Sequence, residues 1–358
     1  MSGPRCVHLV VPEGIDDPSR PSGGNTYDRQ LRHGLSADGW AVSTQEVAGG
    51  WPWPDAEGRR GLQEALAGVP AGSVALVDGL VASTSPEVVV PAAGRRPLVV
   101  LVHMPVGAAP GLHDSASREA AVLRAAASVV VTSAWSRQWL LDNYGLDPAK
   151  VHVARPGVDP ATAAPGPGNG AGDGGDLLCV GAVTPGKGQD VLVSALAGLV
   201  ARRWRCVCVG SLTRAPEFVS RLREQIRGAG LAERVVLAGT RTGRDLAASY
   251  AAAQVLVLPT RGETYGMVVT EALAHGLPVL ASAIGGVPEA MGTTPEGARP
   301  GLLTPPGDPQ ALAEAISSWL DDAALRARLR EAARRRRPTL TRWSETTDAV
   351  GRVLETVR

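Results

Sequence analysis

The chain alternates short apolar runs with helix-like stretches, and this alternation starts twice. Uninterrupted apolar runs are typical of parallel strands that are buried on both faces. Such runs predict strands at residues 6–11, 74–77, 98–102, 129–132 and 151–154, and again at 177–180, 206–209, 235–237, 255–258 and 279–282. Helical patterns lie at residues 26–38, 117–127, 136–143, 189–199, 215–229, 246–252, 309–320, 323–337 and 342–357. The alternation predicts an α/β fold with a doubly wound parallel sheet in each half.

The length of 358 residues favours two domains, because single hydrophobic cores stop growing at about 250–300 residues. Residues 161–175 read A-T-A-A-P-G-P-G-N-G-A-G-D-G-G and have no apolar periodicity. A segment of this composition predicts an interdomain linker, with a long surface loop as the alternative. We therefore expect Rossmann-like domains at residues 1–160 and 176–338, with a last helical segment at 339–358.

Composition excludes several classes of protein. The formal net charge of +1 gives no electrostatic case for binding nucleic acid. No run of 18 apolar residues occurs, and the N-terminus leads into a strand pattern without the features of a signal peptide. The four cysteines lie in apolar runs, so we expect reduced core thiols in a cytoplasmic protein. The arginine run 334–337 predicts a solvated helix end, with peripheral membrane contact as the alternative.

In residues 261–289, closely spaced Gly and Glu residues interrupt the apolar runs. Glu263 lies in a Gly-flanked loop after the apolar run 255–258, and Glu271 lies inside a short helical pattern from near Gly266 to Gly276. A strand, a loop and a helix start offer free backbone N–H groups to an anion. Eight residues of helix span about 12 Å. This arrangement suits a sugar nucleotide, with one carboxylate on the sugar and the other on the ribose.

This segment resembles the E-x7-E region of the retaining glycosyltransferases of family 4, which have the GT-B fold. It contains Tyr265 and Gly266 after the first Glu, then E-A-L-A-H-G-L-P-V, then the G-G-x-x-E turn that ends at Glu289. The resemblance implies two Rossmann-like domains that face a central cleft, and a final helix that packs back on the N-terminal domain. It also implies a nucleotide-sugar donor bound by the C-terminal domain and an acceptor bound by the N-terminal domain.

The same resemblance suggests roles for residues elsewhere. Gly23 and Gly24 match a glycine loop near the donor phosphates, although a Gly pair can serve only a turn. His103 follows the strand at 98–102 and matches a family histidine that contacts the donor sugar; the alternative is a histidine that satisfies a loop carbonyl. Lys187 matches a lysine that neutralises the donor diphosphate. Ala182 stands where the family has an arginine, so another cation has to replace it: Arg155, Arg214 and Arg241 are the candidates.

The resulting candidate site has a catalytic and a donor-binding set. The catalytic set is His103, Lys187 and Glu263. The donor-binding set is Gly23, Gly24, Lys187, Glu263, Thr264, Tyr265, Gly266, Met267, Val268 and Glu271. One of three hydroxyl residues, Thr132, Ser133 or Ser136, is interpreted as a helix cap.

The resemblance implies retaining transfer of a hexosyl or N-acetylhexosaminyl group by front-face attack. No Asp-x-Asp motif follows a strand, so we expect neither a metal nor another cofactor. Family frequency favours a UDP-sugar donor. The absence of a hydrophobic anchor favours a small soluble acceptor, bound by loops 50–55 and 106–114, where Trp51 and Trp53 stack on a ring or simply pack. The alternatives are a GDP-sugar (mannosyl) transferase, and an epimerase-like or non-catalytic nucleotide-sugar-binding protein of the same fold.

Overall fold

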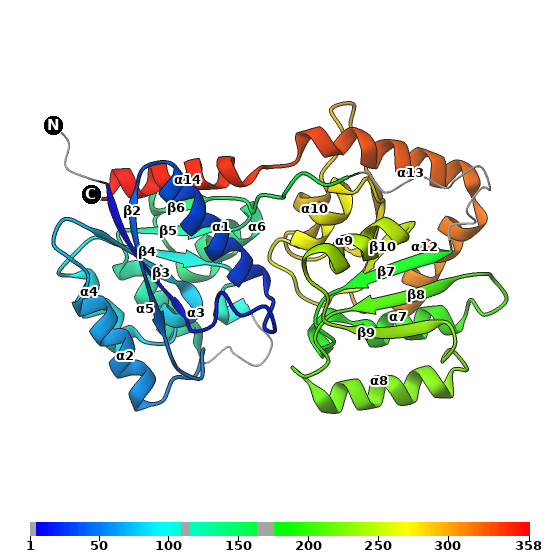
Figure 1. Cartoon of the computed structure of the whole chain (residues 1–358), viewed down its shortest axis with the longest axis horizontal. Helices are drawn as coiled ribbons and strands as arrows, with labels where there is room; N and C mark the ends of the chain where they lie inside the picture. The colour runs from blue at the N-terminus through cyan, green and yellow to red at the C-terminus, as the bar shows by residue number, and fades with distance from the viewer. Residues whose placement is uncertain (1–4, 109–114, 163–174) are drawn as a thin grey trace. The chain divides into compact units, whose positions relative to one another are not determined.

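The computed structural model describes residues 5–108, 115–162 and 175–358. The chain divides into two compact units, one of Met1–Gly157 with Thr341–Arg358 and the other of Val158–Leu340 (Figure 1). Residues 158–160 were expected in the first domain, but Val158 packs in the apolar core of the second unit. Leu340 belongs to the same core, so the second unit ends two residues later than expected. Most of the expected linker at 161–175 lies outside the described residues, as do residues 109–114 of the second expected acceptor loop.

The first unit is built on a six-stranded parallel sheet in the order β2-β1-β3-β4-β5-β6. Its strands are β1 (Cys6–Pro12), β2 (Ala41–Val47), β3 (Val74–Asp78), β4 (Leu98–Val102), β5 (Ser128–Val131) and β6 (Val151–Val153). Its helices are α1 (Gly23–Ala37), α2 (Ala56–Ala67), α3 (Gly79–Ala82), α4 (Pro86–Ala93), α5 (Ala116–Ala125), α6 (Ala134–Tyr144) and α14 (Trp343–Thr356). The order changes direction at β1 and β3, and ligands of such sheets bind at the carboxyl ends of the strands around this point.

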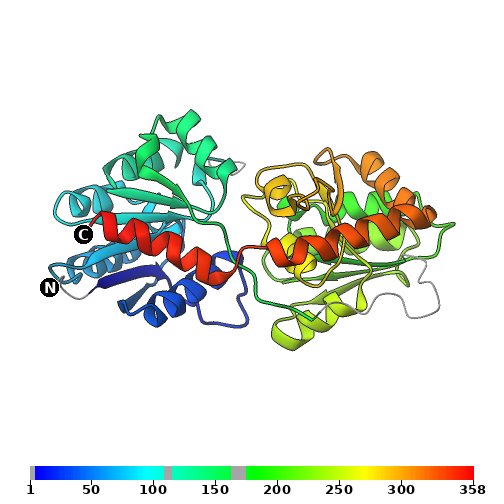
Figure 2. The same cartoon turned by 90° about the horizontal axis from the view of Figure 1, so that it is seen from above.

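Successive strand residues of the first unit point to opposite faces of the sheet, as the pleat requires. Leu76 and Leu101 pack with α1 and α14 on one face, whereas Val77 and Val100 pack with α2, α4, α5 and α6 on the other. Helix α14 lies beside α1 (Figure 2), and the contact is close because a Cβ atom at Gly34 would lie 2.1 Å from Oγ1 of Thr347. The last helix of the chain therefore belongs to the first unit.

The second unit repeats this architecture with the strand order β12-β11-β10-β7-β8-β9, again all parallel. Its strands are β7 (Asp176–Val180), β8 (Arg205–Val209), β9 (Val235–Gly239), β10 (Val255–Leu258), β11 (Val279–Ser282) and β12 (Gly301–Thr304). Its helices are α7 (Gln189–Ala197), α8 (Pro216–Gly228), α9 (Gly243–Ala252), α10 (Met267–Ala274), α11 (Val287–Met291), α12 (Pro309–Asp321) and α13 (Ala323–Arg336). Here the order changes direction between β7 and β10.

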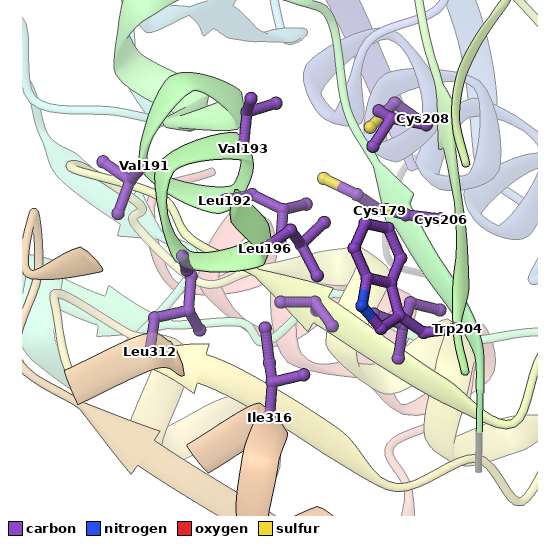
Figure 3. Close-up of a cluster of buried hydrophobic side chains, with 14 of the residues drawn as sticks. Cys179, Val191, Leu192, Val193, Leu196, Trp204, Cys206, Cys208, Leu312 and Ile316 are labelled. Atoms are coloured by element: carbon purple, nitrogen blue, oxygen red, sulfur yellow. The ribbon is translucent and has the colours of Figure 1, made fainter. Parts of the chain in front are cut away.

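One face of the second sheet packs against α7, α8, α12 and α13. Figure 3 shows Leu192 and Leu196 of α7 between the strand residues and Ile316 of α12. Cys206 and Cys208 lie in this core on the same face of β8, as their spacing predicts, and Cys179 of β7 is the register partner of Cys208. The four cysteines are free thiols.

Several elements were not predicted, because their sequences have few apolar residues or are short. The edge strand β2 is A-V-S-T-Q-E-V and only Val47 is buried. The edge strand β12 is a four-residue G-L-L-T. Helices α2, α3, α4 and α11 were also not predicted, and each is either short or polar on most of its surface.

The expectation for the arginine run 334–337 is wrong in part. Arg336 donates to the Met291 carbonyl, and Arg337 donates to the carbonyl oxygens of Ala274 (2.8 Å) and Ala161 (2.7 Å). These two side chains therefore fasten the end of α13 to neighbouring backbone instead of extending into solvent. No helix within the described residues is long and apolar enough to cross a membrane.

Candidate active site

Three loops meet at the carboxyl ends of β7, β10 and β11, beside the β7–β10 change of direction in the second sheet. The loop after β7 ends in a 3₁₀ turn at Pro185–Lys187, from which α7 begins. The loop after β10 is bound to it, because the Arg261 amide and the Thr260 hydroxyl both donate to the carbonyl of Gly186 (2.8 and 3.1 Å). The Arg261 guanidinium also forms a bidentate pair with Asp190 (2.8 and 2.7 Å). These contacts fix the positions of Lys187 and Glu263.

Lys187 and Glu263 form an ion pair. Nζ of Lys187 lies 2.5 Å from Oε2 of Glu263, and the two side chains are 32% and 15% exposed. The two residues come from different loops, 76 positions apart in the chain, so the pair joins the β7 loop to the β10 loop. The sequence assigned these residues separate roles, and the structure brings them into direct contact.

The backbone around Glu263 is held by the G-G turn after β11. The Gly286 amide donates to the Glu263 carbonyl (3.1 Å). A Cβ atom at Gly285, which has a φ of 57°, would lie 1.7 Å from that carbonyl oxygen. Only glycine fits there, because both the positive φ and the close approach exclude a side chain. The turn therefore fixes the loop that presents Glu263, Thr264 and Tyr265.

Helix α10 starts directly after this loop. Its N-cap, Gly266, supplies no side-chain cap, so the amides of Met267 and Val268 lie in the first turn of an uncapped helix. First-turn amides have no partner within their own helix, and the helix dipole adds positive potential there. The helix start and the ammonium of Lys187 are thus both suited to an anionic group.

Glu271 lies one helical turn further along α10. Its Oε2 accepts a hydrogen bond from the Tyr250 hydroxyl (2.7 Å), and the Tyr250 ring stacks on His275 at 4.9 Å. Burial raises the pKa of Glu271, the Tyr250 hydrogen bond lowers it and the nearby Asp159 carboxylate raises it. Glu271 is therefore a half-buried acceptor whose direction is set by Tyr250.

The first unit contains a second group of predicted residues. The Ser22 hydroxyl caps α1 by accepting from the Asn25 amide (3.0 Å), so Gly23 and Gly24 form the first turn of the helix. A Cβ atom at Gly24 would lie 3.3 Å from Cδ2 of His103. The absence of a side chain at Gly24 therefore lets the imidazole lie close to the start of α1.

His103 follows β4 and is 17% exposed. Its Nε2 lies 2.9 Å from Oδ1 of Asp28 and 3.9 Å from Oδ2 of Asp78. The expected alternative, a hydrogen bond from His103 to a loop carbonyl, is replaced by this contact with a carboxylate. Burial by itself lowers the pKa of His103, but the Asp28 and Asp78 carboxylates outweigh it and raise this pKa to about 9.

Asp28 and Asp78 were missed by sequence reasoning. Asp28 lies inside the amphipathic helix α1 and Asp78 is the last residue of the buried run V-A-L-V-D, so nothing in the sequence distinguishes Asp28 from a surface carboxylate. With His103 they form a group of three whose ligand-type atoms lie within 4.8 Å of one another, a spacing that a metal ion could also use. In this structure Asp28 and His103 bind each other directly.

The structure bears on three further sequence hypotheses. The Ser133 hydroxyl caps α6 by accepting from the Ser136 amide (3.0 Å). Trp51 packs and donates from Nε1 to the Val47 carbonyl (3.0 Å), whereas Trp53 is 56% exposed. Of the cations considered as substitutes at Ala182, Arg241 donates to the Ser249 hydroxyl (2.9 Å).

Two family models match the chain. Residues 174–322 match the model described as Glycosyl transferases group 1, and residues 76–162 match Glycosyltransferase Family 4. Together these segments span about two thirds of the chain. The second segment includes His103 and the first includes both Lys187 and the whole Glu263–Glu271 region.

The chain is also similar to curated proteins. A protein of Kineococcus radiotolerans named D-inositol 3-phosphate glycosyltransferase is 36% identical over 253 residues, which cover 64% of this chain and 57% of the relative. The protein of the same name from Jonesia denitrificans is 32% identical over 256 residues, which cover 67% and 59%. The matches thus span little more than half the length of these relatives.

Solved structures resemble the entire chain. HepE from Anabaena, in complex with UDP and glucose, matches with a TM-score of 0.79 at 19% identity and covers 98% of this chain and 99% of its own. Sucrose-phosphate synthase from Thermosynechococcus elongatus matches with a TM-score of 0.79 at 25% identity and 98% coverage of both chains. The two family models show that the chain belongs to family 4 of the glycosyltransferases, and the solved structures show the GT-B fold.

Proposed function

We propose that the protein is a retaining, metal-independent glycosyltransferase that moves a hexosyl or N-acetylhexosaminyl group from a UDP-sugar to a small soluble acceptor. The Lys187–Glu263 ion pair (2.5 Å) beside the start of α10 carries this proposal. It joins a cation and a carboxylate at the change of strand direction, where open α/β sheets bind ligands. The four free thiols favour a cytoplasmic setting.

In the proposed reaction, the donor diphosphate takes the place of Glu263 as the partner of the Lys187 ammonium. The first-turn amides of α10 bind the same phosphates, so charge on the leaving group is stabilised by groups already in position. The released Glu263 carboxylate accepts hydrogen bonds from the sugar hydroxyls. The acceptor oxygen attacks on the face from which the nucleotide departs, and a phosphate oxygen takes the proton of the acceptor hydroxyl.

Similar proteins support the choice of substrates. HepE was solved with UDP and glucose, which favours UDP over GDP in the proposal. The curated relatives are named for D-inositol 3-phosphate, a small polar acceptor of the expected class. A polyol phosphate is therefore the first acceptor to test.

A thermal-shift panel of UDP-, GDP- and ADP-sugars identifies the donor, because a ligand that binds only the folded state raises the unfolding temperature. Transfer is then measured with the stabilising donor and D-inositol 3-phosphate, and NMR of the product gives the anomeric configuration. We expect a UDP-sugar to stabilise and the product to keep the donor configuration. An inverted product would refute the retaining mechanism, and stabilisation by GDP-sugars alone would refute the donor assignment.

The strongest competing function is a nucleotide-sugar-binding protein that does not catalyse transfer. Ala182 motivates it, because the β7 loop carries Lys187 as its one cation. Donor binding without turnover across a panel of acceptors would favour this reading. Interconversion of the donor with its epimer would instead favour an epimerase.

A further inference from the structure

Asp28, His103 and Asp78 form a chain of titratable groups at the carboxyl edge of the first sheet. Asp28 comes from α1, Asp78 from the end of β3 and His103 from the residue after β4. The side chains of Asp28 and Asp78 are 0% and 4% exposed. Within the described residues, the charged and titratable groups that face His103 are these two carboxylates, and the Tyr27 ring of α1 lies edge-on to the imidazole at 5.1 Å.

The hydrogen-bond partners of the two carboxylates limit where the protons can lie. Oδ1 of Asp28 contacts His103, but the buried Oδ2 of Asp28 has no hydrogen-bond donor among the described residues while every carboxyl group is ionised. Asp78 lies within hydrogen-bonding reach of Asp28, and its Oδ1 already accepts from the Leu80 amide (2.7 Å). A proton on Asp78, donated to Asp28, satisfies the remaining oxygen. Two buried carboxylates in contact cannot both ionise cheaply, which favours the same proton.

We propose that Asp28 and Asp78 are positioning residues that keep His103 protonated, so that the imidazolium acts as a fixed cationic hydrogen-bond donor to a substrate oxygen and not as a base. This inference rests on the proposed function for the presence of a substrate. Nε2–H of His103 is directed to Asp28, so Nδ1–H is the donor left for the substrate. The partial exposure of the imidazole, 17%, makes it accessible to a ligand.

The electrostatics of the group agree with this assignment. The pKa of His103 is raised to about 9 by the two carboxylates against the effect of burial. Burial and the Asp28 carboxylate raise the pKa of Asp78 to about 7, while His103 and the Leu80 amide oppose them. Below pH 7, His103 is therefore charged and Asp78 is neutral. Above pH 7 the loss of the Asp78 proton breaks its donation to Asp28.

NMR of the ¹⁵N-labelled full-length chain tests the proton assignment without any substrate. The His103 signals among the six histidines are identified by their loss in His103→Asn. We expect the His103 imidazole to titrate near pH 9 in the wild type and at least about two units lower in Asp28→Asn. Asp16→Asn is the matched control, because Asp16 is an exposed carboxylate that pairs with Arg32 of α1. A wild-type midpoint at or below 6.5 would overturn the proposal even if Asp28→Asn failed to fold.

Activity tests the role of the charge. Asparagine at position 78 keeps a hydrogen-bond donor for Asp28 but cannot ionise, so Asp78→Asn should remove the pH dependence of kcat that ionisation of Asp78 causes near pH 7. Asp28→Asn should lower kcat about 10-fold or more at every pH. An unchanged alkaline limb in Asp78→Asn would overturn the role of Asp78. A shift of the His103 signals on addition of equimolar Zn²⁺ or Mg²⁺ would overturn the proposed role of the two carboxylates and favour a metal site. Because the NMR titration needs no turnover, an absence of glycosyl transfer would refute the proposed function and leave the protonation result intact.

Discussion

Tyr250→Phe tests whether the Glu271 carboxylate is held in position by one hydroxyl. The substitution removes only the oxygen that lies 2.7 Å from Oε2 of Glu271 and leaves the ring, which stacks on His275. Within the described residues, this is the one hydrogen bond found to the Glu271 side chain. A hydrogen bond to a charged group contributes roughly 1.5–3 kcal/mol. Because Glu271 is only half-buried, water replaces part of the lost interaction, and we expect the lower end of this range.

The free energy of unfolding of the second unit, measured by urea titration, should therefore fall by about 1.5 kcal/mol at pH 7. The carboxylate also loses the bond that lowers its pKa, so Glu271 takes up a proton at a higher pH in the folded variant, and the deficit in unfolding free energy should shrink as the pH falls toward that pKa. UDP affinity, measured by calorimetry, should weaken by up to about tenfold, the equivalent of 1.4 kcal/mol. The effect should lie in donor binding and leave kcat nearly unchanged, since Glu271 is assigned to the ribose.

Tyr144→Phe is the control for Tyr250→Phe. The Tyr144 hydroxyl donates to Oε2 of buried Glu119 (2.6 Å), but Glu119 also accepts from the Ser83 hydroxyl and the amides of Val106 and Gly107. Because Tyr144 and Glu119 lie in the first unit, we expect Tyr144→Phe to remove one hydrogen bond to a carboxylate with no change in UDP affinity. Equal unfolding energies and equal UDP affinities for Tyr250→Phe and the wild type would refute the reasoning about Glu271.

Four other outcomes follow from the same geometry. Lys187→Ala should lower kcat by about 10²-fold, as does the loss of one preorganised electrostatic donor elsewhere, and a wild-type kcat would assign the diphosphate to another cation. Glu263→Ala should mainly lower kcat, whereas Glu271→Ala should raise the donor KM about 10- to 150-fold; the reverse pattern would interchange their roles. Activity should persist in excess EDTA, and loss that Mn²⁺ or Mg²⁺ restores would contradict metal independence. Finally, the raised pKa values of Asp78 (about 7) and His103 (about 9) mean that the folded state holds these protons more tightly. Urea titrations should therefore show stability falling as pH rises through 7 and 9, and Asp28→Asn should flatten the upper part of this decline.

The sequence predicts the central strands better than the edges of each sheet. The runs at 98–102, 255–258 and 279–282 agree residue for residue with β4, β10 and β11, because strands buried on both faces must be apolar throughout. The edge strand β2 has solvent on much of its surface and needs no such run. Helix α1 begins three residues earlier than predicted because the Ser22 cap lets two glycines enter the first turn. These differences arise where tertiary contacts or capping outweigh apolar periodicity.

The residues of the candidate site also differ in how far the sequence predicts them. Glu263, Gly285 and Lys187 were predictable because their loops resemble a family pattern, and the close approach of Gly285 to the Glu263 carbonyl gives that pattern a steric reason. The ion pair between Lys187 and Glu263 was not predictable, since it depends on strand order that places β7 beside β10. The grouping of Asp28 and Asp78 with His103 depends even more strongly on the fold, because Asp28 lies in a helix and Asp78 ends a strand. The family resemblance identifies a histidine at the end of β4, but its charge is set by two carboxylates that the resemblance does not mention. The protonation of His103 is thus a property of the folded first unit, and it can differ between relatives that share the same histidine.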